Sequence, residues 1–111
     1  MYLQGKAEPT WQLIRRFRDR QGLSQQALAE RLAVISGNSS ITREHVSRWE
    51  RGKRIPNPYW RVWLGRALEI PPEWLERAAM IARRVRVIHD STSHEYSLES
   101  LGLGSWGDHV G

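Results

Sequence analysis

The chain has 111 residues, is 40% hydrophobic and contains no cysteine. This length suits one domain with a modest core, and the lack of cysteine excludes disulfides, thiolate zinc sites and cysteine-based catalysis. No apolar run approaches the roughly 18 residues of a membrane span and no signal peptide is apparent, so we expect a soluble, cytoplasmic protein.

The formal net charge of +5 is unevenly distributed along the chain. Residues 10–86 carry sixteen Lys and Arg against seven Asp and Glu, a net charge of +9, whereas residues 87–111 carry four acids and no Lys or Arg. Because a basic domain attracts polyanions, a nucleic acid or an acidic lipid surface becomes a candidate partner.

The first predicted helix follows a short N-terminal lead, residues 1–9, which shows no sustained period. Thr10 is a predicted N-cap, and the apolar residues after it recur at helical spacing from about Trp11 to Gln21. The next helix begins after Ser24, another predicted N-cap, and spans the segment SQQALAERLAVI, in which Ala27, Leu28, Leu32 and Ile35 form the apolar stripe.

A polar, turn-rich segment, SGNSS at residues 36–40, separates the second helix from a short third one. Thr42 can cap this helix, and Ile41 with Val46 forms a hydrophobic staple at its start. Because Gly52 fits a C-cap and prolines follow it, the third helix is predicted at about Arg43 to Arg51.

Two further helices complete the predicted domain, which comprises residues 10–86. Asn57 as N-cap with Pro58 behind it opens the fourth, and the fifth begins at about Glu73 after the prolines of IPP. The only strand-like pattern is the short VRVI at residues 85–88. The sequence therefore predicts an all-α fold, a compact five-helix bundle.

Residues 87–111 form an acidic tail rich in Ser and Gly, although it keeps several apolar residues. We expect this tail to be poorly ordered until something binds it. Two roles are open for it: it could dock a protein partner, or it could fold back over the basic domain and compete with phosphate.

The second and third helices have the features of a helix-turn-helix, in which the second helix enters the major groove. Ala29 supplies a small residue where the helices cross. Val46 and Trp49 lie three positions apart and are predicted to face the core. The opposite side of the third helix then carries Arg43, Glu44, Ser47 and Arg48.

The segments GLSQQALAERLA and VSRWERGKRIPNP resemble the Cro/repressor-type helix-turn-helix domain known as the XRE family, over roughly Leu13 to Leu75. This resemblance implies a bacterial transcription regulator with a four- or five-helix bundle that binds operator DNA, commonly as a homodimer. The sequence departs from the family between Ser24 and Trp49, where it is about seven residues longer than the tight family pattern. We therefore expect a second helix about one turn longer, followed by a loop at SGNSS that either touches the adjacent phosphates or extends into solvent. The angle of the third helix is left open.

Carried over by position, the resemblance implies that Arg43, Glu44 and Arg48 face the bases from a recognition helix at residues 42–52, while Ser47 could touch a base or a phosphate. Arg can donate two hydrogen bonds to guanine, and Glu can accept one from cytosine. The alternative for Glu44 and Arg48 is a mutual ion pair one helical turn apart.

Phosphate contacts are expected at the start of the second helix and around the recognition helix. The resemblance implies that Gln25 touches a phosphate and braces the recognition helix. The remaining predicted phosphate-binding residues are Thr42, Arg51, Lys53 and Arg54. For Glu50 the resemblance implies a structural ion pair with Arg18, and Trp49 is interpreted as a core residue rather than a base-stacking aromatic.

Catalysis and metal binding find no support in the sequence. The four histidines, His45, His89, His94 and His109, lack the i, i+4 spacing of a zinc helix, and no obvious nucleophile accompanies them. We expect neither an enzyme nor a cofactor or metal. The leading prediction is a sequence-specific regulator that binds double-stranded DNA, and the alternative is a protein interaction module that uses the tail or the tryptophan-rich last two helices.

Overall fold

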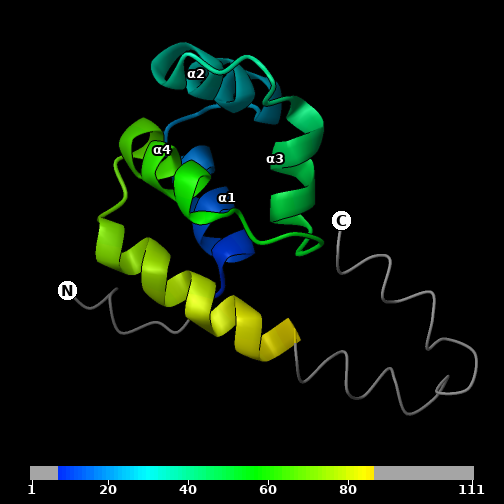
Figure 1. Cartoon of the computed structure of the whole chain (residues 1–111), viewed down its shortest axis with the longest axis vertical. Coiled ribbons are helices and arrows are strands. Elements are labelled where there is room, and N and C mark those ends of the chain that lie inside the picture. Colours follow the sequence, from blue (N-terminus) through cyan, green and yellow to red (C-terminus); the bar gives the residue numbers. More distant parts are fainter. Residues whose placement is uncertain (1–7, 87–111) are drawn as a thin grey trace, which may run out of the picture.

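A computed structural model describes residues 8–86, and within this range the chain folds into five helices without a strand (Figure 1). The all-α prediction is thereby confirmed. The expected lead, apart from residues 8 and 9, and the expected acidic tail lie outside the described residues. The helices are α1 (Thr10–Arg20), α2 (Gln25–Ser36), α3 (Arg43–Glu50), α4 (Pro58–Leu68) and an unlabelled fifth helix that occupies residues 72–86.

Local capping signals account for most helix starts. The Ser24 side chain accepts a hydrogen bond from the backbone N–H of Ala27, and the Asn57 side chain accepts one from Trp60, each at 2.9 Å. The prediction that Thr10 caps α1 is wrong, because Pro9 occupies the N-cap position and Thr10 is the first helical residue. Thr10 is fully buried, and its hydroxyl has no hydrogen-bond partner among residues 8–86.

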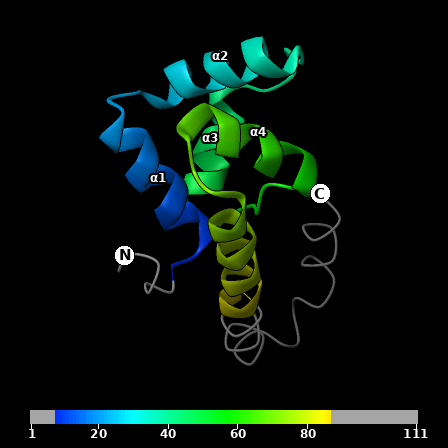
Figure 2. The same cartoon turned by 90° about the vertical axis from the view of Figure 1, so that its left-hand side faces the viewer.

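The core lies where α1, α2, α3, α4 and the fifth helix meet, with α2 across one end of the bundle (Figure 2). Its fully buried side chains include Ile14, Leu28, Leu32, Val46, Leu64, Leu68 and Leu75. Ile35, which the apolar stripe of α2 predicted to face inward, is exposed. It falls in the final turn of α2, beyond the last buried residue of that helix, Leu32.

The connection between α2, a helix of 12 residues, and α3 is a loop with its own hydrogen bonds. Gly37 ends α2 in the left-handed conformation, with φ of 73°, which glycine adopts without steric cost. The Asn38 side chain then accepts hydrogen bonds from both the backbone N–H and the hydroxyl of Ser40. Ile41 and Val46 are both buried, in agreement with the predicted staple that seats the start of α3.

The loop after α3 is held against two other helices. Gly52 has φ of 73°, a conformation that favours glycine, and a Cβ at this position would lie 3.2 Å from the ring of Trp11, a tight contact that the ring would have to relieve by shifting. The carbonyl of Pro56 accepts a hydrogen bond of 2.7 Å from Arg61 on α4. Arg61 in turn donates two hydrogen bonds to Glu76 on the fifth helix. These contacts position the loop that carries Lys53 and Arg54.

The fifth helix starts at residue 72, one position before the expected start. Of the strand-like VRVI segment, residues 85 and 86 are helical and the other two lie outside the described range. None of the helices in residues 8–86 is long and apolar enough to cross a membrane.

Candidate nucleic-acid interface

The short helix α3 has a buried side and an exposed side. Val46, Trp49 and Glu50 are buried, with Trp49 only 4% exposed. The predicted base-facing residues take the other side, where Arg43, Glu44 and Arg48 are exposed and Ser47 is half-buried. Apart from Glu50, the helix thus carries its charged residues outward, while its apolar residues hold it to the bundle.

Glu50 is the charged residue of α3 that points inward, and its side chain is completely buried. The ion pair with Arg18 that the family resemblance implied is present: Arg18 on α1 donates through Nε to Oε2 at 2.6 Å and through Nη2 to Oε1 at 2.8 Å. Burial alone raises the pKa of Glu50, but the hydrogen bonds from Arg18 and Gln25 together with the charges of Arg18 and Arg15 outweigh it, so the pKa is lowered.

Gln25, the first residue of α2, also donates to this carboxylate, from Nε2 to Oε1 at 2.9 Å. The buried carboxylate of Glu50 therefore ties α1, α2 and α3 together. Because an amide nitrogen carries two N–H groups, Gln25 keeps a second donor while it braces α3. A phosphate near the start of α2 could accept from that donor.

The start of α3 is capped by a pair that includes a residue missed from the sequence. Thr42 and His45 form a reciprocal capping box, and the backbone N–H of Thr42 donates to His45 Nδ1 at 3.1 Å. This bond requires the imidazole tautomer with its proton on Nε2. The spacing of three residues was a usable signal, but the motif usually has Glu or Gln in the second position.

The exposed side of α3 carries a small ion network. Glu44 Oε2 lies 3.3 Å from Arg48 Nε and 3.4 Å from Arg51 Nη2. Such exposed pairs are weak, about 0.2 to 0.5 kcal/mol each, so a DNA base or phosphate can compete for these side chains. Within residues 8–86, Arg43 has no hydrogen-bond or ion-pair partner for its side chain.

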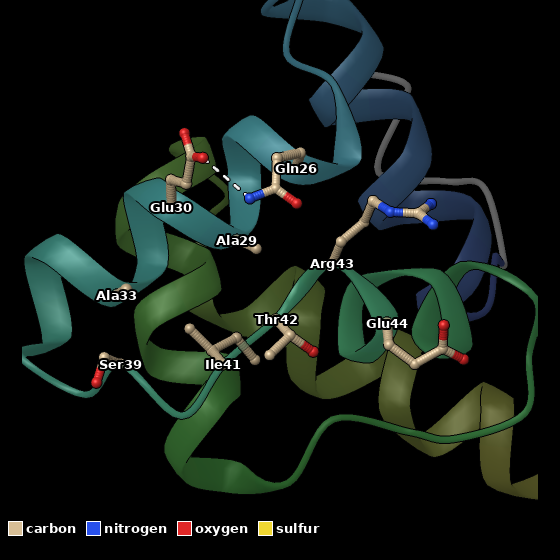
Figure 3. A pocket seen from close by; sticks show the side chains of 9 residues that line it. All are labelled: Gln26, Ala29, Glu30, Ala33, Ser39, Ile41, Thr42, Arg43 and Glu44. Carbon is tan, nitrogen blue, oxygen red and sulfur yellow. Dashed lines mark hydrogen bonds between the residues drawn. The ribbon is translucent and has the colours of Figure 1, made fainter.

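A hollow of about 540 Å³, lined by both polar and apolar side chains, lies between α2 and the start of α3. Figure 3 shows Gln26 and Glu30 on α2 along one wall, with Thr42, Arg43 and Glu44 at the opposite side. Gln26 donates to Glu30 at 2.9 Å. Ser39 and Ile41 of the connection between α2 and α3 also line the hollow, so its shape depends on that segment.

The predicted phosphate-binding residues beyond α3 are close to it and exposed. The backbone N–H groups of Lys53 and Arg54 both approach the carbonyl of Arg48, at 2.9 and 3.4 Å. Arg51, Lys53 and Arg54 therefore surround the C-terminal end of α3 and are open to solvent. Among residues 8–86, no group of three or more His, Asp or Glu side chains is placed to hold a metal ion.

The arrangement of α2 and α3 defines a class of protein. Two packed helices, the second with a polar, exposed outer side, form the helix-turn-helix unit of DNA-binding proteins. The family model described as helix-turn-helix matches residues 14–59. Residues 14–59 are thus similar to a helix-turn-helix DNA-binding domain, the kind that the resemblance to the XRE family predicted. No curated protein and no solved structure matches the chain.

Proposed function

We propose that this protein is a regulator that recognises a specific sequence in double-stranded DNA by placing α3 in the major groove. The observation that supports the proposal is that α3 has a buried side and an exposed side. Trp49 and Glu50 lie on the buried side, and the other charged residues of α3 are exposed together. A major groove accommodates one α-helix, and side chains on its free side can reach base edges. In this proposal the protein acts in the cytoplasm and associates with the nucleoid when it is bound to DNA.

Base reading is assigned to Arg43, Glu44, Ser47 and Arg48. Arg43 is the strongest of these, because its guanidinium is not engaged by another described residue and can donate two hydrogen bonds to one guanine. Glu44 and Arg48 contact each other in the free protein, so their use in base reading requires that an exposed ion pair opens or is shared. The predicted alternative, a mutual ion pair, is thus compatible with a role in binding.

Phosphate binding is assigned to residues that frame α3. Gln25 offers its second amide N–H at the start of α2, and Thr42 stands at the start of α3. Arg51, Lys53 and Arg54 follow α3, on a loop that Arg61 and Trp11 hold in place. Contacts of this kind orient a protein on DNA without specifying a sequence.

Selection from random duplex DNA, followed by binding across a salt series, tests this function. Wild type should enrich one sequence and bind it less tightly as salt rises. Arg43→Ala should relax the preference at one base position, with a loss of about 1 to 3 kcal/mol for the selected site. Lys53→Ala should weaken all sequences alike and reduce the salt slope by about one unit. A selection that enriches no sequence would contradict the proposal and favour the interaction module.

A second copy is proposed to bind alongside the first, on paired half-sites about 34 Å or a multiple of it apart. The outer side of α4 offers a surface for it: Tyr59 and Val62 are exposed, and the guanidinium of Arg66 lies over the half-buried ring of Trp63, 5.1 Å from its centre. Exposed apolar residues that cluster on one helix suit a protein contact. The same surface supports the alternative function, docking of a different protein.

Sedimentation of the purified protein distinguishes a second copy of the chain from a different protein as the partner of α4. We expect wild type to dimerise in solution or on a two-half-site duplex, and Val62→Glu to weaken dimerisation at least tenfold, since it introduces a charge that the contact would bury. Val85→Glu, at an exposed position on the fifth helix, is the matched control and should leave dimerisation unchanged. A wild-type protein that is monomeric in both conditions would point to a different protein as the partner of α4.

A further inference from the structure

Arg15 on α1 belongs to none of the residue groups assigned so far, yet it reaches the centre of the interface. Its Nε lies 3.7 Å from Oε1 of Glu50, and its side chain is 56% exposed. Glu50 already receives two hydrogen bonds from Arg18, so Arg15 is not required to neutralise it. Within residues 8–86, the terminal nitrogens of Arg15 have no hydrogen-bond partner.

Two donors from different helices converge at the same carboxylate oxygen. Gln25 Nε2 lies 2.9 Å from Oε1 of Glu50, and Arg15 Nε approaches that atom as well. The head groups of Arg15 and Gln25 are therefore neighbours, one charged and largely exposed, the other at the N-terminus of α2. That N-terminus adds unpaired backbone N–H groups and a partial positive charge.

The position of Arg15 along α1 also places it near the end of α3. Trp11, one helical turn earlier on α1, packs against Gly52 directly after α3. Arg15 thus meets Glu50 at the last residue of α3, where Gln25 bonds the same carboxylate and Arg51 is the next residue along the chain. This location links the two groups of residues to which phosphate binding is assigned.

We propose that Arg15 binds a phosphate of the DNA backbone jointly with Gln25, while the buried carboxylate of Glu50 holds both side chains in position. The planar guanidinium can offer two parallel N–H groups to phosphate oxygens, and the Gln25 amide adds a third donor. The inference rests on the proposed DNA-binding function, and it adds α1 as a third helix in contact with the nucleic acid. Because the contact is to phosphate, Arg15 contributes affinity at every sequence.

The test measures binding of the full chain to its selected duplex and to an unrelated duplex across a salt series. Arg15→Gln removes the charge but keeps an N–H donor for Glu50. We expect it to weaken binding to both duplexes by the same factor, roughly tenfold, and to lower the salt slope by about one unit. Arg15→Lys should retain the slope, because it keeps the charge.

Arg20→Gln is the matched control. Arg20 is an exposed arginine of the same helix whose guanidinium lies over the ring of Phe17, away from Glu50, and its replacement changes the net charge equally. Equal behaviour of Arg15→Gln and Arg20→Gln would overturn the inference while leaving the DNA-binding function intact. A wild-type protein that binds neither duplex would instead reject the function itself. Thermal unfolding of each variant identifies any loss of affinity that comes from loss of fold.

Discussion

Replacement of Glu50 by Ala should destabilise the protein by about 3 to 5 kcal/mol, the range seen when one partner of a buried ion pair is removed. The side chain of Glu50 is inaccessible to solvent and accepts hydrogen bonds from Arg18 and Gln25. Without the carboxylate, the largely buried guanidinium of Arg18 keeps only its hydrogen bond to the carbonyl of Leu23 and its contact with Asp19. Urea unfolding followed by circular dichroism measures the loss.

Glu44→Ala is the matched control for Glu50→Ala on the same helix. Glu44 is 54% exposed and contacts Arg48 and Arg51 at the surface, so its removal should change the free energy of unfolding by less than about 1 kcal/mol. Equal effects of the two substitutions would mean that the Glu50 cluster does not hold α1, α2 and α3 together.

The same carboxylate makes stability depend on pH. The pKa of Glu50 is lowered in the folded protein, so its stabilising contribution is present above the ordinary glutamate pKa of about 4.3 and is lost as the pH falls through the lowered pKa. Glu50→Gln removes this titration. The free energy of unfolding of the Glu50→Gln variant should therefore decline less steeply than that of wild type as the pH falls. Glu76, whose pKa is lowered mainly by the hydrogen bond from Arg61, contributes a pH dependence in both proteins.

Trp49→Ala should cost about 3 to 5 kcal/mol of unfolding free energy, since it leaves a cavity where a large buried ring was. The Trp49 ring packs beside that of Trp60, with their centres 6.4 Å apart. Because the ring faces the core, the folded fraction of the variant should keep the base preference of wild type. Thermal unfolding and duplex selection on the same preparation measure both effects.

Trp63→Ala provides the comparison for Trp49→Ala. Trp63 is half-buried on the outer side of α4, so its loss should destabilise the monomer clearly less. Trp49→Phe keeps a ring in the core and should recover most of the stability. A folded Trp49→Phe variant with a changed base preference would show that the ring contacts DNA, against the core assignment.

Much of the recognition helix could be predicted from the sequence. The staple of Ile41 and Val46, the Thr42 cap and the glycine after the helix located α3 to within one residue, since each signal acts over a few positions. The apolar spacing of Val46 and Trp49 also determined which side of the helix is free. The capping prediction failed at Thr10 because α1 begins one residue earlier than expected, so that Pro9 takes the N-cap position.

The cluster of side chains around Glu50 could be predicted only in part from the sequence. The family resemblance implied the Arg18 pair and the bracing role of Gln25, but it implies no role for Arg15, one of four arginines in α1. Nothing local distinguishes Arg15 from Arg16, whose guanidinium pairs with Glu8 instead. Which arginine reaches Glu50 depends on how α1 is rotated against α3, and that rotation follows from packing of the whole core.

The sequence by itself determined the five helices and the outward set of charges on α3, because caps and helical periodicity act within one element. The helix-turn-helix followed from the resemblance of two segments to a known family. The tertiary structure alone decided which groups meet: Arg15, Gln25 and Glu50 come from three helices, and Arg61 joins Pro56 to Glu76. The hollow beside Arg43 was likewise decided by the tertiary structure, because residues of α2, the connection after it and α3 line it together. Such contacts have no period along the chain, because they depend on the packing of residues that are distant in sequence.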